Sequence, residues 1–101
     1  MKSPKIISKI TQNQQITFMQ SDINYTIIHL QDGRKLISGY NLKFFENIVC
    51  NDAFRRLSRS IIVNRQFVKS ISKDDFQLTM FNGQRVNITR RRMKDLIDWI
   101  R

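Results

Sequence analysis

Short stretches in which apolar and polar residues alternate, or in which β-branched residues cluster, recur along the chain and predict strands. The chain has only three Gly and one Pro, so no flexible linker is expected between these stretches. The predicted strands are a short one that begins with Ile16 and Phe18, followed by residues 24–30, 34–38, 60–63, 66–71, 76–80 and 85–88.

Two dipeptides predict hairpin turns between these strands. Asp32-Gly33 and Asn82-Gly83 each lie between two of the predicted strands. Both dipeptides favour the positive φ angles that a two-residue hairpin turn requires. A tight connection or a bulge is expected at residues 64–65, between two further strands.

Two other stretches have apolar residues at helical spacing. The first is residues 41–50, where Asn41 is suited to cap the helix N-terminus. Its apolar face consists of Leu42, Phe45, Ile48 and Val49. The second is residues 90–100, which Thr89 can cap, and its apolar face consists of Met93, Leu96, Ile97 and Ile100. Trp99 lies off this second face, so we expect it to pack on a partner or to fold back.

These elements predict a mainly β fold with two short helices. A chain of 101 residues fits one domain and leaves no room for two independent cores. Residues 1–14 are rich in Lys and then in Gln and Asn. We expect them to form a loose arm or an edge strand ahead of the domain proper, residues 15–101.

The charge of the chain is its most unusual property. Lys and Arg number 18 against 8 Asp and Glu, so the net charge is +10. Residues 1–50 carry six basic and three acidic side chains, and residues 51–101 carry twelve and five. A basic excess concentrated in one half of the chain indicates a polyanionic partner. The alternative is a solvated basic face without a partner.

Catalytic, metal-binding and membrane-spanning classes find no support in the residues. Cys50 is the one cysteine and His29 the one histidine, which leaves no disulfide framework and no thiolate zinc cluster. The acidic residues are scattered or lie at predicted turns, as Asp74 and Asp75 do, and no Gly-rich phosphate loop is present. We therefore expect neither an enzyme nor a cofactor. No apolar run is long enough to span a membrane or form a signal peptide, so a cytoplasmic location is expected.

Two arginine clusters indicate where a polyanion could bind. Residues 55–60 contain three Arg and precede a predicted strand, so they are assigned to a loop. Arg90, Arg91 and Arg92 open the second predicted helix, where cations oppose the helix dipole. An anion held at this helix N-terminus would offset that unfavourable term. Because Arg forks onto phosphate and onto guanine, the clusters indicate a surface for duplex DNA.

The order of motifs resembles the LytTR DNA-binding domain family. Residues 54–64, FRRLSRSIIVN, resemble the family signature F-x-R-x-H-R-S-x-x-V-N. Residues 24–33, NYTIIHLQDG, resemble its N-Y-T-x-I-H-L-x-D-G segment. Residues 38–46 resemble the S-L-K-x-x-E stretch, and residues 82–91 resemble the closing N-G…I-S-R-R. The match runs from Ile16 to Leu96.

The resemblance implies an elongated stack of antiparallel β-sheets with one or two short helices. It also implies a bacterial transcription regulator that inserts loops into successive major grooves at promoter direct repeats and bends the DNA. The residues at base-contacting positions of the family are Asn24, Ser58, Arg59 and Arg90. The neighbouring basic residues expected to contact phosphates are Arg56, Arg65, Lys69, Arg91 and Arg92.

The chain departs from the family pattern at three points. Ser58 replaces the usual His, so we expect a different target sequence, and Gln20 replaces a common acidic residue. A phosphoacceptor receiver domain is absent from these 101 residues. We therefore expect a stand-alone regulator controlled by abundance, by a regulatory partner protein or by dimerisation. The alternative is a fragment of a longer regulator.

Two other binding functions stay open. The first is a protein-interaction module or co-regulator that docks on an acidic partner or caps another regulator, through apolar surface such as Trp99. The second is an RNA-binding module, which the lack of paired stacking aromatics disfavours. A homodimer on DNA direct repeats is also expected, and by elimination its interface would be the last helix, with Leu96, Ile97, Trp99 and Ile100.

Overall fold

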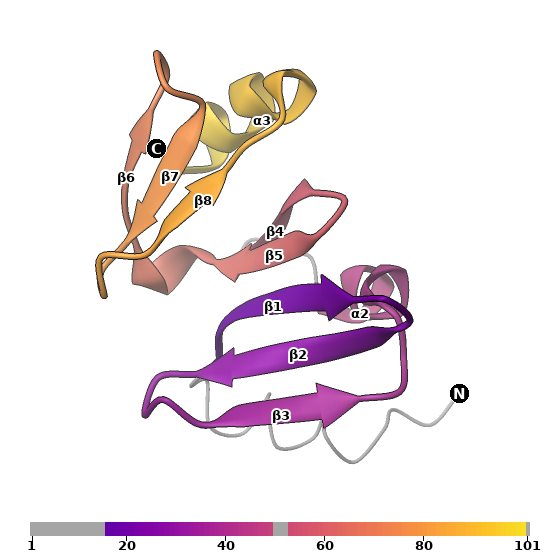
Figure 1. The fold of residues 1–101 in the computed structure, drawn as a ribbon. Coiled ribbons are helices and arrows are strands. Elements are labelled where there is room, and N and C mark those ends of the chain that lie inside the picture. The colour runs from indigo at the N-terminus through magenta and orange to yellow at the C-terminus, as the bar shows by residue number, and fades with distance from the viewer. Residues whose placement is uncertain (1–15, 50–52, 101) are drawn as a thin grey trace.

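Two antiparallel sheets form the framework of the chain in the computed structural model, which describes residues 16–49 and 53–100 (Figure 1). The five-stranded sheet has the order β3-β2-β1-β5-β4 and the three-stranded sheet the order β6-β7-β8. The strands of the first sheet are β1 (Ile16–Asp22), β2 (Tyr25–Leu30), β3 (Lys35–Ser38), β4 (Phe54–Ser58) and β5 (Ile61–Asn64). Those of the second are β6 (Val68–Ser72), β7 (Gln77–Met80) and β8 (Arg85–Asn87). The predicted mainly β, elongated fold is confirmed, with principal extents of 40 × 26 × 24 Å.

Both predicted hairpin dipeptides form tight turns. Gly33 and Gly83 have φ angles of 92° and 91°, which a residue with a Cβ rarely adopts. In the second turn, Asn82 Oδ1 accepts a hydrogen bond from the backbone N–H of Gln84 at 2.9 Å. The predicted hairpins β2–β3 and β7–β8 both form, but only the glycine of each dipeptide has a positive φ, whereas the sequence predicted it at both turn positions.

The central strands β1 and β5 are buried on both faces, because each contributes to two hydrophobic cores. Phe18 and Val63 lie in a core shared with the three-stranded sheet and α3 (Arg90–Ile100). Their neighbours Met19 and Ile62 lie in a second core, beneath α2 (Leu42–Val49). Since side chains alternate along a strand, consecutive apolar residues serve opposite faces of the sheet.

The first helix forms largely as predicted. Asn41 Oδ1 accepts a hydrogen bond from the backbone N–H of Phe44 at 2.9 Å, which confirms the N-cap. The buried residues of α2 are Leu42, Phe45 and Val49. Ile48 is 37% exposed and lies at the border of the buried face, contrary to the prediction.

The second helix packs its predicted face on the core and also buries Trp99, which lay off that face. Trp99 is only 7% exposed and lies in the core with Met93 and Leu96, whereas Ile97 is only half-buried. The helical spacing i, i+3, i+6 of these three residues adds Trp99 to the buried face. Trp99 therefore folds back, and it is not an exposed docking residue for a partner. Leu96 and Trp99 are likewise buried, so neither lies on the surface where a dimer interface would need them.

The assignment of residues 55–60 to a loop is wrong for most of that stretch. Phe54–Ser58 is strand β4, which pairs with β5 and contains a register shift between Arg56 and Ser58. Arg55 and Arg56 are both polar, so the sequence does not show the alternation of polar and apolar residues that is typical of a strand, although Leu57 is buried in a core. Residues 66–67, predicted as strand, belong to a 3-10 turn, η1 (Arg65–Phe67), capped by Asn64. Residues 1–14 and Cys50 lie outside the described residues.

Candidate nucleic-acid interface

The turn between β1 and β2 presents two exposed residues, Ile23 and Asn24. Ile23 is 89% exposed and has a φ of +57°, in the left-handed region. Asn24 is the position for which the resemblance predicts a base contact. Neither residue belongs to a core, so both side chains are accessible at this end of the five-stranded sheet.

The turn between β4 and β5 lies beside the β1–β2 turn. The backbone N–H of Ser21, near the end of β1, donates to the carbonyl of Ser60 at 2.8 Å. Arg59 is exposed at this turn, and its side chain has no hydrogen-bond or ion-pair partner among residues 16–49 and 53–100. The Ser58 hydroxyl oxygen accepts a hydrogen bond from the backbone N–H of Ser60 at 3.1 Å. The two turns, one with Asn24 and the other with Arg59, thus lie side by side.

The side chain of Arg56 stabilises the β4–β5 turn by hydrogen bonds to its backbone. Its Nη2 donates to the carbonyl of Arg59 at 2.8 Å, and its Nε donates to the carbonyl of Ser58 at 3.0 Å. Its Nη1 forms an ion pair with Glu46 Oε1 of α2 at 2.6 Å. The side chain is only 15% exposed, so most of its donor capacity is used inside the protein.

The first turn of α3 joins the same side of the molecule. Arg92 Nη1 donates to the carbonyl of Arg56 at 3.2 Å, which ties the helix start to β4. Arg90 and Arg91 are exposed, and the first turn contains no acidic residue. The guanidinium of Arg90 lies 5.4 Å from the centre of the Phe76 ring, within the range of a cation–π contact.

We call residues 23–24, 58–60 and 89–92 together the basic edge. Figure 1 shows their three elements one after another along one side of the molecule: the β1–β2 turn, the β4–β5 turn and the start of α3. Pairing of β1 with β5 brings the first two together, and the contacts of α3 with β4 bring the third. All four predicted base-contacting residues lie on this edge: Asn24, Ser58, Arg59 and Arg90.

Two of the predicted phosphate-contacting residues lie elsewhere. Arg65 follows β5 at the far end of the sheet, and its Nη2 donates to the carbonyl of Ile100 at 3.2 Å. A cation near the C-terminus of α3 interacts favourably with the helix dipole. Lys69 is exposed on β6, at the edge of the three-stranded sheet. Arg91 and Arg92 lie on the basic edge, and Arg56 supports it from behind.

Ile23 on the basic edge and Phe76 beside it were not singled out from the sequence. The non-glycine residues with positive φ in the described chain are Ile23 and Phe76. Ile23 directly precedes Asn24 in the chain, and the ring of Phe76 lies against the guanidinium of Arg90. Asn24 and Arg90 are both predicted base-contacting residues. Backbone strain of this kind concentrates at functional sites. An isoleucine between two polar residues in a hairpin turn is the signal that could have identified Ile23.

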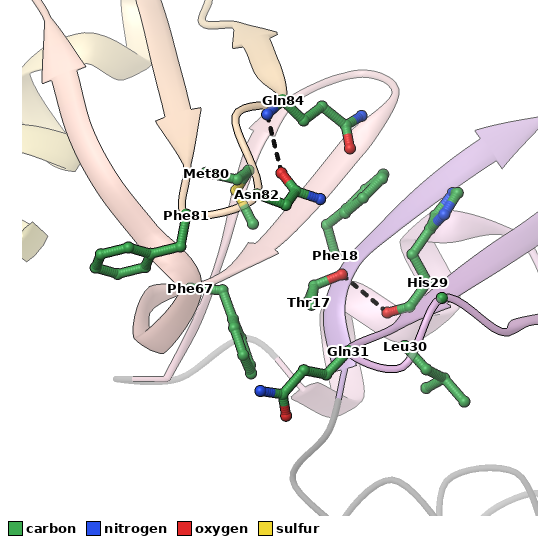
Figure 2. A pocket seen from close by; sticks show the side chains of 11 residues that line it. Thr17, Phe18, His29, Leu30, Gln31, Phe67, Met80, Phe81, Asn82 and Gln84 are labelled. Carbon is green, nitrogen blue, oxygen red and sulfur yellow. Dashed lines mark hydrogen bonds between the residues drawn. The ribbon is translucent and has the colours of Figure 1, made fainter.

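A cleft of about 350 Å³ lies at the other end of the molecule, between the two sheets (Figure 2). Its lining includes Phe18, His29, Phe67 and Met80, and contains no Lys or Arg. The ring of His29 stacks on Phe18 with centroids 4.0 Å apart, and its Nε2 hydrogen-bonds Gln20 Oε1 at 3.1 Å. Burial, and secondly the charge of Lys35, hold the pKa of His29 below its ordinary value. The cleft therefore lacks the cations that a nucleic-acid backbone requires.

The part of the chain that the structure describes contains neither a metal-binding cluster of side chains nor a helix that could span a membrane. It brings no three His, Cys, Asp or Glu residues close enough to hold a metal ion. None of its helices combines the length and the apolar character needed to cross a membrane.

Comparison with known proteins identifies a family and a related structure. The sequence model of the LytTr DNA-binding domain matches residues 8–101. The fold is similar to the LytTr DNA-binding domain of a Bacillus cereus protein assigned as a methyl-accepting/DNA response regulator. The two share 26% sequence identity with a TM-score of 0.76, over 86% of this chain and 82% of that one. Among curated protein sequences, none matches the chain.

Proposed function

The chain belongs to the LytTR DNA-binding domain family, and from that premise we propose that it regulates transcription by reading a specific duplex DNA sequence with its basic edge. The observation that carries the proposal is that the β1–β2 turn, the β4–β5 turn and the start of α3 lie along one side of the molecule (Figure 1). These three elements contain Asn24, Arg59 and Arg90. All three side chains are exposed, and two of them are arginines.

The chemistry of these side chains fits recognition in the major groove. Asn pairs bidentately with adenine, and Arg pairs bidentately with guanine. We assign these roles to Asn24, Arg59 and Arg90. The hydroxyl of Ser58 can donate to a base acceptor, because its oxygen already accepts the hydrogen bond from Ser60.

Phosphate binding would be supplied by the arginines next to these base readers. Arg91 and Arg92 lie in the first turn of an 11-residue helix whose N-terminal dipole also attracts anions. A phosphate at this position would offset the mutual repulsion of three adjacent arginines. Such contacts fix the orientation of the domain on DNA without specifying sequence.

The finer architecture of the complex is part of the proposal. We propose that two copies of the domain bind neighbouring direct repeats in a promoter, with their turns in successive major grooves. A second copy or a regulatory partner protein would then control occupancy, in the cytoplasm. The burial of Trp99 in the core weighs against the alternative of an interaction module that docks through this residue.

The test is fluorescence anisotropy of the protein with two duplexes over a salt series. One duplex comes from the region upstream of its own gene or from selection out of a random pool, and the other is its scrambled sequence. We expect a saturable preference for the first duplex, which Arg59→Ala and Arg90→Ala each reduce. Arg34→Ala is the matched control, because Arg34 is an exposed arginine at the β2–β3 turn, far from the basic edge. Equal binding to both duplexes, from every source, would refute sequence-specific recognition.

A further inference from the structure

Ile23 occupies a backbone conformation that does not suit it. Its φ of +57° lies in the left-handed region, where Gly and Asn are favoured and a β-branched residue is an outlier. Exposed single isoleucines are common and require no explanation. An exposed isoleucine in a left-handed turn is different, because two common residues would fit the same position with less strain.

Packing within the described chain does not compensate for this strain. The residue is 89% exposed and belongs to neither hydrophobic core. Ile37 offers a comparison, since it is 72% exposed but lies in the regular backbone of β3. The strained isoleucine is the one that stands on the basic edge, next to Asn24 and beside the turn that carries Arg59.

On the premise of the function proposed above, we propose that Ile23 recognises thymine by packing its side chain on the C5 methyl group in the major groove. The side chain of isoleucine has no donor or acceptor, so it cannot bind a phosphate or a polar base edge. Among the four bases, thymine alone presents an apolar group in the major groove. An apolar side chain at the tip of a DNA-reading turn therefore has one complementary partner.

The neighbouring residue defines the sequence context. Asn24 is chemically suited to adenine, and it follows Ile23 directly in the turn. The β1–β2 turn would then read adenine and thymine at adjacent or overlapping base pairs. Arg59 and Arg90 would read guanines elsewhere in the same site. The target is thus expected to hold an A·T segment flanked by G·C pairs.

The assignment is tested by removing one apolar group from each partner: a thymine methyl group from the DNA and the side chain of Ile23 from the protein. The full chain is first used to select its own duplex from a random pool. Each thymine of that duplex is then replaced in turn by deoxyuridine, which removes only the methyl group. Affinities are measured for the unsubstituted protein, for Ile23→Ala and for the control Ile37→Ala.

The inference predicts one thymine position at which loss of the methyl group weakens binding by about fourfold. That loss should disappear in Ile23→Ala and persist in Ile37→Ala. If a duplex is selected and every uracil substitution affects the unsubstituted protein and Ile23→Ala equally, the thymine contact is refuted while the proposed function stands. If no sequence is enriched at all, the proposed function fails and this inference fails with it.

A second variant separates recognition from folding. Ile23→Asn suits the left-handed backbone, so it should raise the midpoint of thermal unfolding. The same variant should bind the selected duplex more weakly and lose the uracil effect. A residue with a purely structural role would not give opposite changes in stability and in binding. A fall in thermal stability together with unchanged binding would contradict the inference.

Discussion

The guanidinium of Arg56 and the carboxylate of Glu46 lie 2.6 Å apart and join the β4–β5 turn to helix α2. Arg56 also donates to the carbonyls of Ser58 and Arg59, so one side chain holds both the helix and the turn. The sequence predicted a phosphate ligand at this position. Its contacts instead favour a positioning residue, which holds the backbone of the turn while Arg59 extends outward.

Salt dependence distinguishes a positioning role of Arg56 from phosphate binding. Each phosphate contact contributes about −0.9 to the slope of log affinity against log salt concentration. We expect Arg56→Gln to reduce the preference for the selected duplex with little change of slope. Arg91→Gln should reduce the slope by about one and weaken all duplexes alike. Glu46→Gln should reproduce the Arg56→Gln phenotype, and a slope that falls by about one in Arg56→Gln would identify a phosphate ligand instead.

Loss of a base-reading arginine should change the sequence preference of the protein more than its binding to all duplexes alike. We expect Arg59→Ala and Arg90→Ala each to cost about 1–3 kcal/mol of binding to the selected duplex and to relax sequence preference at one position. Binding to scrambled duplex should change far less. Repeating the selection with each variant measures this directly. If both variants enriched the original sequence unchanged, these arginines would not read bases.

The ring of Phe76 should matter through Arg90. Phe76→Leu removes the aromatic face beneath the guanidinium, and we expect it to weaken specific binding by about 0.5–1 kcal/mol. In an Arg90→Ala background the same change should have little effect, because the cation is gone. Phe81→Leu is the matched control, since Phe81 is an exposed phenylalanine at the opposite end of the molecule. Additive losses in the double variant would show that the two residues act independently.

His29 should make the protein less stable in mild acid. The pKa of His29 in the folded protein lies below its ordinary value of 6.5, so the unfolded chain takes up a proton first as pH falls. The stability contributed by the neutral ring is therefore complete above that value and declines as pH falls toward the folded pKa. Urea denaturation at about pH 7.5 and about pH 5 measures the decline. His29→Phe keeps a ring to stack on Phe18 and should show a smaller decline, whereas an equal decline would exclude His29 as its source.

Local signals in the sequence predicted much of the fold. The dipeptides at both hairpins and Asn41 before α2 each act over a few residues, so the sequence predicts them directly. Strand β4 was hidden because its consecutive arginines break the visible alternation of apolar and polar positions. Trp99 was left between two alternatives, packing on a partner or folding back, because it lies outside the apolar stripe that the helical spacing shows first.

The sequence predicted which residues form the candidate site but not how they are arranged in space. Asn24, Arg59 and Arg90 stand out by motif and residue type. Their meeting on one edge depends on pairing of β1 with β5 and on packing of α3 against β4, and no local pattern specifies either. The bond of Arg56 to Glu46, ten residues earlier, depends equally on tertiary structure.

The two-sided burial of β1 has a consequence for the cooperativity of folding. Phe18 and Met19 are neighbours in the chain, yet they belong to different cores, so neither core can open without exposing a strand that the other requires. The sheets are therefore halves of one folding unit rather than separable modules. The backbone amides of β1 and β5 should exchange with solvent only through global unfolding. For DNA recognition, this means that the turns and the start of α3 are held by one rigid body, and the groove must adapt to their spacing.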